Sequence, residues 1–260
     1  MKSLFACIKA ELVKHRKSWP MLIAILAPIC QVGFIGMLFW FSDAVVVRFQ
    51  PGSRFWLELN FAAWNLFVLP TIGALVPAMS WRQDRDASAI RHLLHQPVKK
   101  IHQYLAKLSC IFFHFLGSQL LLGVLVPIVG MTFNQNEALK GWMGTFDTAL
   151  YFKFCLFSLL ASVPVVSFHA WFSFRFHSPA IALGAALAGT WAAVKLIGAT
   201  SLVQFLPWGL SGFASTAFER MSFALPWGFC VGALAMAIVF ATIGSLDFSK
   251  NAFLNSLERN

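Results

Sequence analysis

The chain has 260 residues, of which 58% are hydrophobic and only 12% are charged. Soluble domains carry roughly 25% charged residues, so this composition excludes a disordered chain and an ordinary soluble enzyme. The 28 phenylalanines against 2 tyrosines favour hydrocarbon surroundings, where a hydroxyl group finds no hydrogen-bond partner. We therefore predict an all-α polytopic membrane protein with one transmembrane domain over residues 1–260.

Residues 1–18 are predicted to form a cytoplasmic, interfacial amphipathic helix along the membrane. Four apolar side chains recur at helical spacing on one face: Leu4, Phe5, Ile8 and Leu12. Lysines on the opposite face would meet water and anionic headgroups. The charged residues assigned to this interfacial helix are Glu11, Lys14, Arg16 and Lys17. The helix is either an anchor that sets topology or a surface that also contacts a cytoplasmic partner.

A membrane span needs about 20 mostly apolar residues. Stretches that meet this requirement predict six transmembrane helices: Trp19–Ser42, Glu58–Ser80, Leu108–Phe133, Thr148–Phe172, Ala180–Phe205 and Leu225–Leu246. Outside the spans, the side with both termini carries 14 Lys and Arg residues, and the other side carries 4. Cytoplasmic loops are enriched in these residues, so both termini are predicted to be cytoplasmic. Topology thus explains the net charge of +10, and no nucleic-acid partner is expected.

The longest polar interruption, residues 81–107, is predicted to be a cytoplasmic segment that contains a short helix. Asp86 has the side chain of an N-cap residue, and Pro97 would end the helix. Three apolar residues form a stripe at positions i, i+3 and i+4: Ile90, Leu93 and Leu94. A helix this short is not stable alone, so its stripe must pack against headgroups or a partner protein.

This segment resembles the first cytoplasmic loop of ABC-2 type exporter permeases. The residues that match in order are Asp86, Leu93-Leu94, Pro97-Val98-Lys99-Lys100 and Lys107. The opening of the chain is similar to the same family through Glu11-Leu-x-Lys14-x-Arg16-Lys17-Ser-Trp19 and the later Pro28. Within the family, the size of the chain and the stretch Trp64-x4-Leu69-Pro70 most resemble the lantibiotic-immunity permeases.

The resemblance implies the permease subunit of an ATP-driven ABC exporter in a bacterial inner membrane. Such a subunit moves an amphiphilic substrate, such as an antimicrobial peptide, a lipid or a drug, by alternating access. The short helix would be a coupling helix in a cleft of a separate cytoplasmic ATPase subunit, present in two copies, which binds ATP and Mg. A second permease chain, identical or a sister, would complete the pathway. The residues assigned to ATPase coupling are Asp86, Ile90, Arg91, Leu93, Leu94 and Pro97.

Other features of the spans are candidates for the transport pathway and for chain pairing. The pathway candidates are Asn60, Asn65, Lys153 and Lys195. The two lysines could instead snorkel outwards, and the asparagines could bond across helices. Small residues on spans one and five predict contact between two permease chains: Gly33, Gly36, Gly184, Ala188 and Gly189. The Gly- and Pro-rich residues 205–226 would be the family's external re-entrant hairpin.

No motif for catalysis, cofactor binding or metal binding is found in the sequence. The P-loop pattern is absent, so any ATP would be bound by the partner. The five cysteines fit no zinc spacing and are interpreted as buried thiols, and His114 and His169 as groups that hydrogen-bond between helices. Two alternatives stay open: a stand-alone secondary transporter or channel, and a membrane-embedded lipid enzyme. A neighbouring reading frame for a P-loop ATPase would discriminate between them and the exporter.

Overall fold

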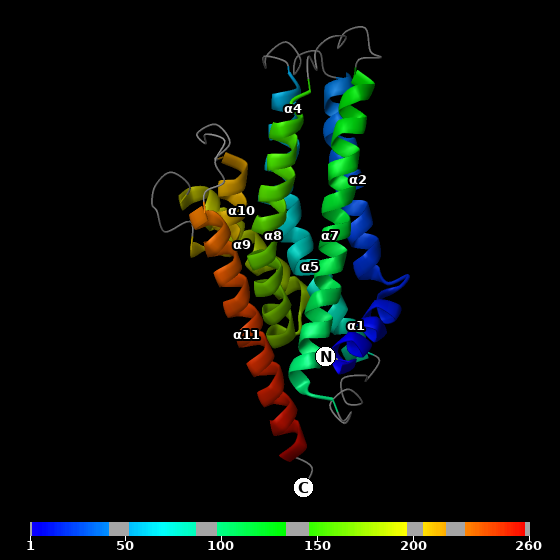
Figure 1. Cartoon of the computed structure of the whole chain (residues 1–260), viewed down its shortest axis with the longest axis vertical. Helices are drawn as coiled ribbons and strands as arrows, with labels where there is room; N and C mark the ends of the chain where they lie inside the picture. The colour runs from blue at the N-terminus through cyan, green and yellow to red at the C-terminus, as the bar shows by residue number, and fades with distance from the viewer. Residues whose placement is uncertain are drawn as a thin grey trace.

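The computed structural model describes residues 2–41, 52–86, 98–133, 146–196, 205–216 and 227–257. Within these ranges the chain is an elongated bundle of helices without strands (Figure 1). Six helical stretches in the described ranges are long and apolar enough to cross a membrane. The predicted all-α class with six transmembrane helices is therefore confirmed.

The first helix and the last turns of the C-terminal helix lie at the same end of the bundle (Figure 1). We call this end the α1 end. In chain order the helices are α1 Lys2–His15, α2 Trp19–Phe41, α4 Ser53–Ala63, the π-helix η1 Trp64–Val68, α5 Leu69–Asp86, α7 Lys100–Thr132, α8 Thr148–Phe176, α9 Pro179–Leu196, α10 Pro207–Thr216 and α11 Trp227–Leu257.

The second span is longer and less regular than predicted. The sequence placed it over Glu58–Ser80, whereas α4, η1 and α5 form one helical stretch from Ser53 to Asp86. Hydropathy marks only the apolar part of a helix, and backbone hydrogen bonding continues into its polar ends. The π-helical turn in the middle was not predicted from sequence. Such turns are rare and occur frequently at functional sites.

The predicted cytoplasmic segment 81–107 is shorter than expected because both of its ends are helical. Residues 81–86 continue α5, and α7 begins at Lys100 rather than at Leu108. Asp86 is the last residue of α5. The other residues assigned to ATPase coupling lie outside the described residues: Ile90, Arg91, Leu93, Leu94 and Pro97. Their role stays a prediction.

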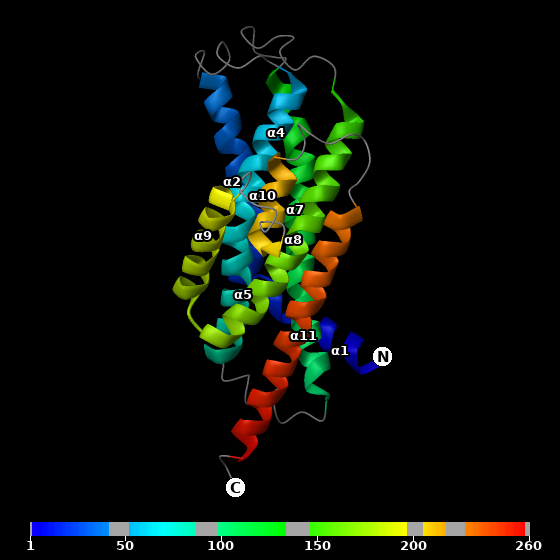
Figure 2. The ribbon, with the colours of Figure 1, turned by 90° about the vertical axis from the view of Figure 1, so that its left-hand side faces the viewer.

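Helix α10 lies against the bundle beside α8 and α9 (Figure 2). It belongs to the predicted hairpin 205–226, whose second arm, 217–226, lies outside the described residues. The indole Nε1 of Trp208 donates to Nε2 of His169 at 3.3 Å, and its ring packs edge-on against Phe168. The prediction that His169 hydrogen-bonds between helices is thus confirmed.

Two of the glycines predicted at a contact between chains instead face their own chain. A Cβ added at Gly189 would collide with the ring of Trp208, and one at Gly36 would lie 2.9 Å from Cγ1 of Val129. Gly33 and Gly184 have open space at the same position. The sequence identified small residues correctly but could not distinguish those that admit a neighbouring helix of the same chain from those on the outer surface.

We expect Gly189→Ala to destabilise the protein, because the ring of Trp208 is held by His169 and Phe168 and must shift. Overpacking of this kind costs about 1–3 kcal/mol. Gly117→Ala is the control, because Gly117 is exposed inside α7 and its Cβ meets nothing within 4 Å. It should be neutral or should stabilise α7 by up to about 1 kcal/mol. Reversible unfolding in mixed micelles measures both, and equal effects would contradict the packing argument.

Candidate functional site: a buried ion network

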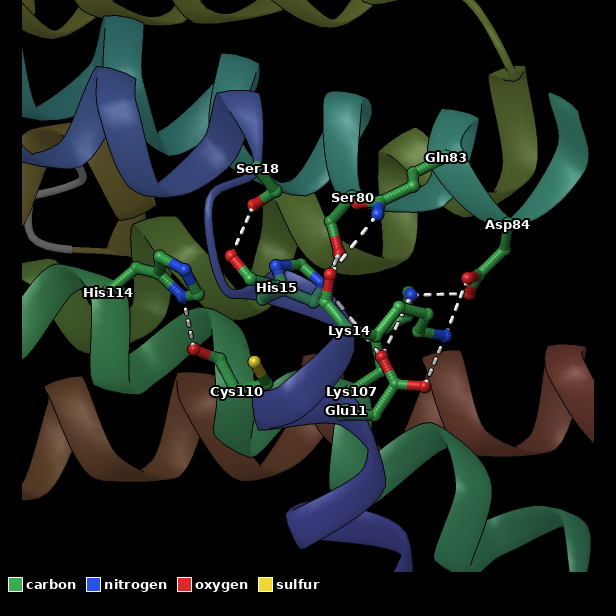
Figure 3. A network of polar contacts seen from close by, with 10 residues as sticks. All are labelled: Glu11, Lys14, His15, Ser18, Ser80, Gln83, Asp84, Lys107, Cys110 and His114. Carbon is green, nitrogen blue, oxygen red and sulfur yellow. Dashed lines mark hydrogen bonds and ion pairs between the residues drawn. The ribbon is translucent and has the colours of Figure 1, made fainter. Parts of the chain in front are cut away.

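Two carboxylates and two ammonium groups meet inside the bundle at the α1 end (Figure 3). Glu11 and Lys14 come from α1, Asp84 from α5 and Lys107 from α7. Nζ of Lys14 lies 2.6 Å from Oε1 of Glu11 and 2.6 Å from Oδ1 of Asp84. Nζ of Lys107 lies 3.2 Å from Oε2 of Glu11 and also donates to Oδ2 of Asp84. Each charge therefore contacts two opposite charges, and the four together are neutral.

The network is shielded from solvent. The side chains of Asp84 and Lys107 are 1% and 2% exposed, that of Glu11 is 9% exposed, and only Lys14 reaches the surface at 28%. Burying a charge without a partner costs several kcal/mol, so groups in such a site depend on one another. The network therefore joins α1, α5 and α7 in one arrangement and resists arrangements in which a single charge is left unpaired.

Helical spacing explains how α1 supplies its part. Glu11, Lys14 and His15 stand at i, i+3 and i+4 and share one face, which the structure turns towards α7. The apolar Phe5 and Leu12 are 65% and 42% exposed on the outside. The sequence placed lysines of this helix on the water side, and Lys9 is exposed. The burial of Glu11 and the partial burial of Lys14 were not predicted from the sequence.

The remaining two charges assigned to the interfacial helix follow α1. Arg16 and Lys17 are exposed at the turn that leads into α2. Lys17 has a φ of 62°, a left-handed conformation that commonly ends a helix. The position of α1 along a membrane surface stays a prediction.

Burial and neighbouring charges shift the pKa values of Lys14 and His15, which lie on the face of α1 turned towards α7. Burial alone would lower the pKa of Lys14, but the carboxylates of Glu11 and Asp84 outweigh it and raise that pKa above its ordinary value. Burial, with the positive charge of Lys107, lowers the pKa of His15 to about 3. His15 is therefore a neutral imidazole at physiological pH, and its Nε2 lies 3.0 Å from Oγ of Ser80.

Trp81 connects the network to the rest of the bundle. Its ring lies beneath Nζ of Lys107, 5.0 Å from the ring centroid, and its Nε1 donates to the carbonyl oxygen of Ala170 on α8 at 2.9 Å. Tyr104, on α7, stacks on the same indole. Sequence reasoning missed Trp81, Asp84 and His15. The spacing of Trp81 and Asp84 does not by itself predict a buried ion network, because a carboxylate one helical turn after a tryptophan is also common on a solvated helix end.

The pathway candidates do not form one cluster. Asn60 and Asn65 are fully buried near η1. Oδ1 of Asn65 accepts from Oγ of Ser158 on α8 at 2.7 Å, and Nδ2 of Asn60 donates to the carbonyl oxygen of Trp56 in its own helix. Lys153 is half-buried near the start of α8, and Lys195 is exposed in the last turn of α9. A pathway role for these four residues stays a prediction.

A cleft of about 1020 Å³ opens on the flank of the bundle, between the start of α2 and the end of α5. Lys17 and Arg82 contribute cationic groups to its wall, and the rest of the wall is largely apolar. The apolar lining residues are Trp19, Pro20, Met21, Leu22, Ile25 and Met79. This combination of charge and apolar surface suits a ligand with an anionic head and a hydrocarbon tail.

The fold and this site define a multi-pass α-helical membrane protein whose helices are tied together at one end by buried ion pairs. The chain matches the family model described as "ABC-2 family transporter protein" over residues 7–192. It therefore belongs to the ABC-2 transporter family, and the matched region holds all four charges of the network. A search of curated proteins found no match.

Proposed function

We propose that the chain is the permease subunit of an ATP-driven ABC exporter, with both termini in the cytoplasm of a bacterial cell. The observation that carries the proposal is the position of the ion network within an ABC-2 family chain. Asp84 lies at the end of the helix that enters residues 87–97, and Lys107 lies near the start of the helix that leaves them. Residues 87–97 are the ones expected to dock on the ATPase.

The network supplies a mechanism for this coupling. A force on residues 87–97 acts on the ends of α5 and α7, which the Asp84–Lys107 pair holds together. The same two side chains are bonded to Glu11 and Lys14, so α1 moves with them. Separating any one pair takes one of two partners from each of two buried charges, so the helix ends move as a unit rather than separately. Closure of two ATPase subunits would then rock the permease between inward- and outward-facing states.

The lining of the cleft between the start of α2 and the end of α5 is an argument for an amphiphilic substrate. Its two cationic residues would hold an anionic head, and its apolar wall would hold a tail. Among the substrates proposed from sequence, this charge favours an acidic lipid or drug over a cationic antimicrobial peptide. Lantibiotic immunity remains a narrower proposal that rests on the family resemblance alone.

A second permease chain, identical or a sister, is proposed to complete the transport pathway. Of the small residues on spans one and five, Gly33 and Gly184 have open space outside them, and Ala188 is exposed. These positions allow the close helix approach that chain pairing in a membrane requires.

Affinity capture tests the proposed partner. The tagged chain, extracted from its native membrane in mild detergent, should recover a P-loop ATPase that mass spectrometry identifies. The double variant Leu93→Asp/Leu94→Asp should lose this ATPase and keep its membrane insertion. Leu93→Ile/Leu94→Ile, which preserves the apolar stripe, should retain it. Recovery of the chain alone, with substrate moved by the reconstituted chain without ATP, would instead establish the stand-alone transporter.

A further inference from the structure

Beside the ion network, three side chains with metal-binding atoms converge on one point (Figure 3). They are His15 from α1 and Cys110 and His114 from α7, and one ligand atom of each lies within 4.8 Å of the other two. His15 and Cys110 are buried, and His114 is half-buried. We propose that His15, Cys110 and His114 form a three-ligand site for a soft monovalent metal ion, of which Cu⁺ is the biological example.

The hydrogen bonds of the two imidazoles favour ligation. Nδ1 of His114 lies 2.7 Å from the carbonyl oxygen of Cys110, which can only accept, so the proton is on Nδ1 and the lone pair is on Nε2. Nε2 of His15 is bonded to Oγ of Ser80, while its Nδ1 is buried without a hydrogen-bond partner among the described residues. Metal-binding histidines typically engage one ring nitrogen in this way and present the other to the ion.

The unpartnered Nδ1 of His15 is the second, independent sign of a ligand. A buried polar atom without a partner costs about 1–3 kcal/mol. The side chain of His15 is only 2% exposed, so bulk water does not reach that atom. A metal ion shared with Cys110 would satisfy it.

Charge decides which ion fits. One thiolate and two neutral imidazoles carry a charge of −1, so Cu⁺ makes the unit neutral and Zn²⁺ leaves it at +1. The four charges of the neighbouring network already cancel, so nothing there compensates an additional buried positive charge. Thiolate ligands also select Cu⁺, and three ligands leave incomplete the tetrahedral set that Zn²⁺ prefers. Binding breaks the S–H bond of Cys110 and releases its proton to water.

The site would fasten α1 to α7. His15 is the last residue of α1, which lies at the edge of the bundle (Figure 1). His114 is only half-buried, so the three ligands lie close to the surface and an ion can approach from that side. Bound metal would then hold α1 in the position that the ion network requires. This inference does not depend on the proposed exporter function, because it concerns metal binding by the chain itself.

Metal titration of the full chain in lipid nanodiscs tests the proposal. Cu⁺ is supplied under argon against a colorimetric Cu⁺ chelator, and Zn²⁺ is titrated in parallel against a zinc chelator. We expect one Cu⁺ per chain, held more tightly than Zn²⁺. Cys110→Ser should weaken Cu⁺ binding by more than the roughly 100-fold that loss of an outer partner costs, and Ser80→Ala should weaken it by about 10–100-fold. Cys30→Ser, at an exposed cysteine of α2, is the matched control and should bind as the unchanged chain does.

Two readouts separate ligation from misfolding. Cu⁺ should raise the melting temperature of the unchanged chain and of Cys30→Ser but not that of Cys110→Ser, whose metal-free melting temperature should be close to normal. X-ray absorption at the copper edge should show one sulfur and two nitrogen neighbours. Equal Cu⁺ affinity in the unchanged chain and Cys110→Ser, a copper environment without sulfur, or preferential binding of Zn²⁺ would each overturn the proposal.

Discussion

Lys107→Met should destabilise the protein by about 3–5 kcal/mol, which is the cost of removing one partner from a buried ion pair. The substitution keeps the unbranched side chain in a site that is 2% exposed, but it leaves Glu11 and Asp84 with Lys14 as their shared cation in the network. Two buried carboxylates held by one ammonium group cannot both be compensated. Reversible unfolding in mixed micelles measures the effect.

The double variant Glu11→Gln/Lys107→Met tests the cause. It removes one charge of each sign and leaves the Lys14–Asp84 pair, so it should recover part of the stability that Lys107→Met loses. Lys9→Met is the control, because Lys9 is exposed on α1 and its loss changes the net charge equally. If Lys9→Met and Lys107→Met have the same effect, the network does not hold the helices together.

Trp81→Ala should cost about 3 kcal/mol or more, within the range for truncation of a buried tryptophan. Its indole is 2% exposed and packs against Phe174 of α8 and Phe248 of α11, at centroid distances of 5.1 and 5.8 Å. The same change removes the hydrogen bond to Ala170 and the ring beneath Lys107. We therefore expect a loss of stability together with weaker coupling between the α1 end and α8.

Trp191→Ala is the matched control for this prediction. Trp191 is 66% exposed on the outer face of α9, so its truncation leaves no cavity. Thermal unfolding in detergent should show a large downward shift for Trp81→Ala and a small one for Trp191→Ala. The variant Trp81→Phe, which keeps an aromatic ring but no N–H group, should lie between them. Similar shifts for Trp81→Ala and Trp191→Ala would mean that Trp81 does not join the helices.

Much of the architecture could be predicted because hydrocarbon imposes simple requirements. A spanning segment must be helical and apolar over a fixed length, so apolar runs of that length located the spans. The starts of α2 and α8, at Trp19 and Thr148, agree with the prediction. The polar ends could not be located in the same way, since α5 and α7 extend as helices beyond the apolar run. In these polar ends of α5 and α7 the hydropathy of the sequence falls while the backbone hydrogen bonds of the helix continue.

The histidines and cysteines show a second limit. His114 was expected to bond between helices, but its Nδ1 bonds to the carbonyl oxygen of Cys110 in its own helix. Cys30 was expected to be a buried thiol and is exposed on the outer face of α2. Apolar surroundings in the sequence do not say which face of a helix meets another helix, because lipid-facing and core-facing residues are equally apolar.

The amino-acid sequence by itself determined the class of protein, the six spans and the family resemblance, because these depend on composition and on order along the chain. Only the tertiary structure decided the direction of the α1 face, which places Glu11 and His15 inside and Phe5 outside. Helical spacing shows which residues share a face but not what that face meets. The ion network requires residues of three helices, 96 positions apart at most, to lie within hydrogen-bond reach. No local pattern records that distance, because it results from how the whole bundle packs.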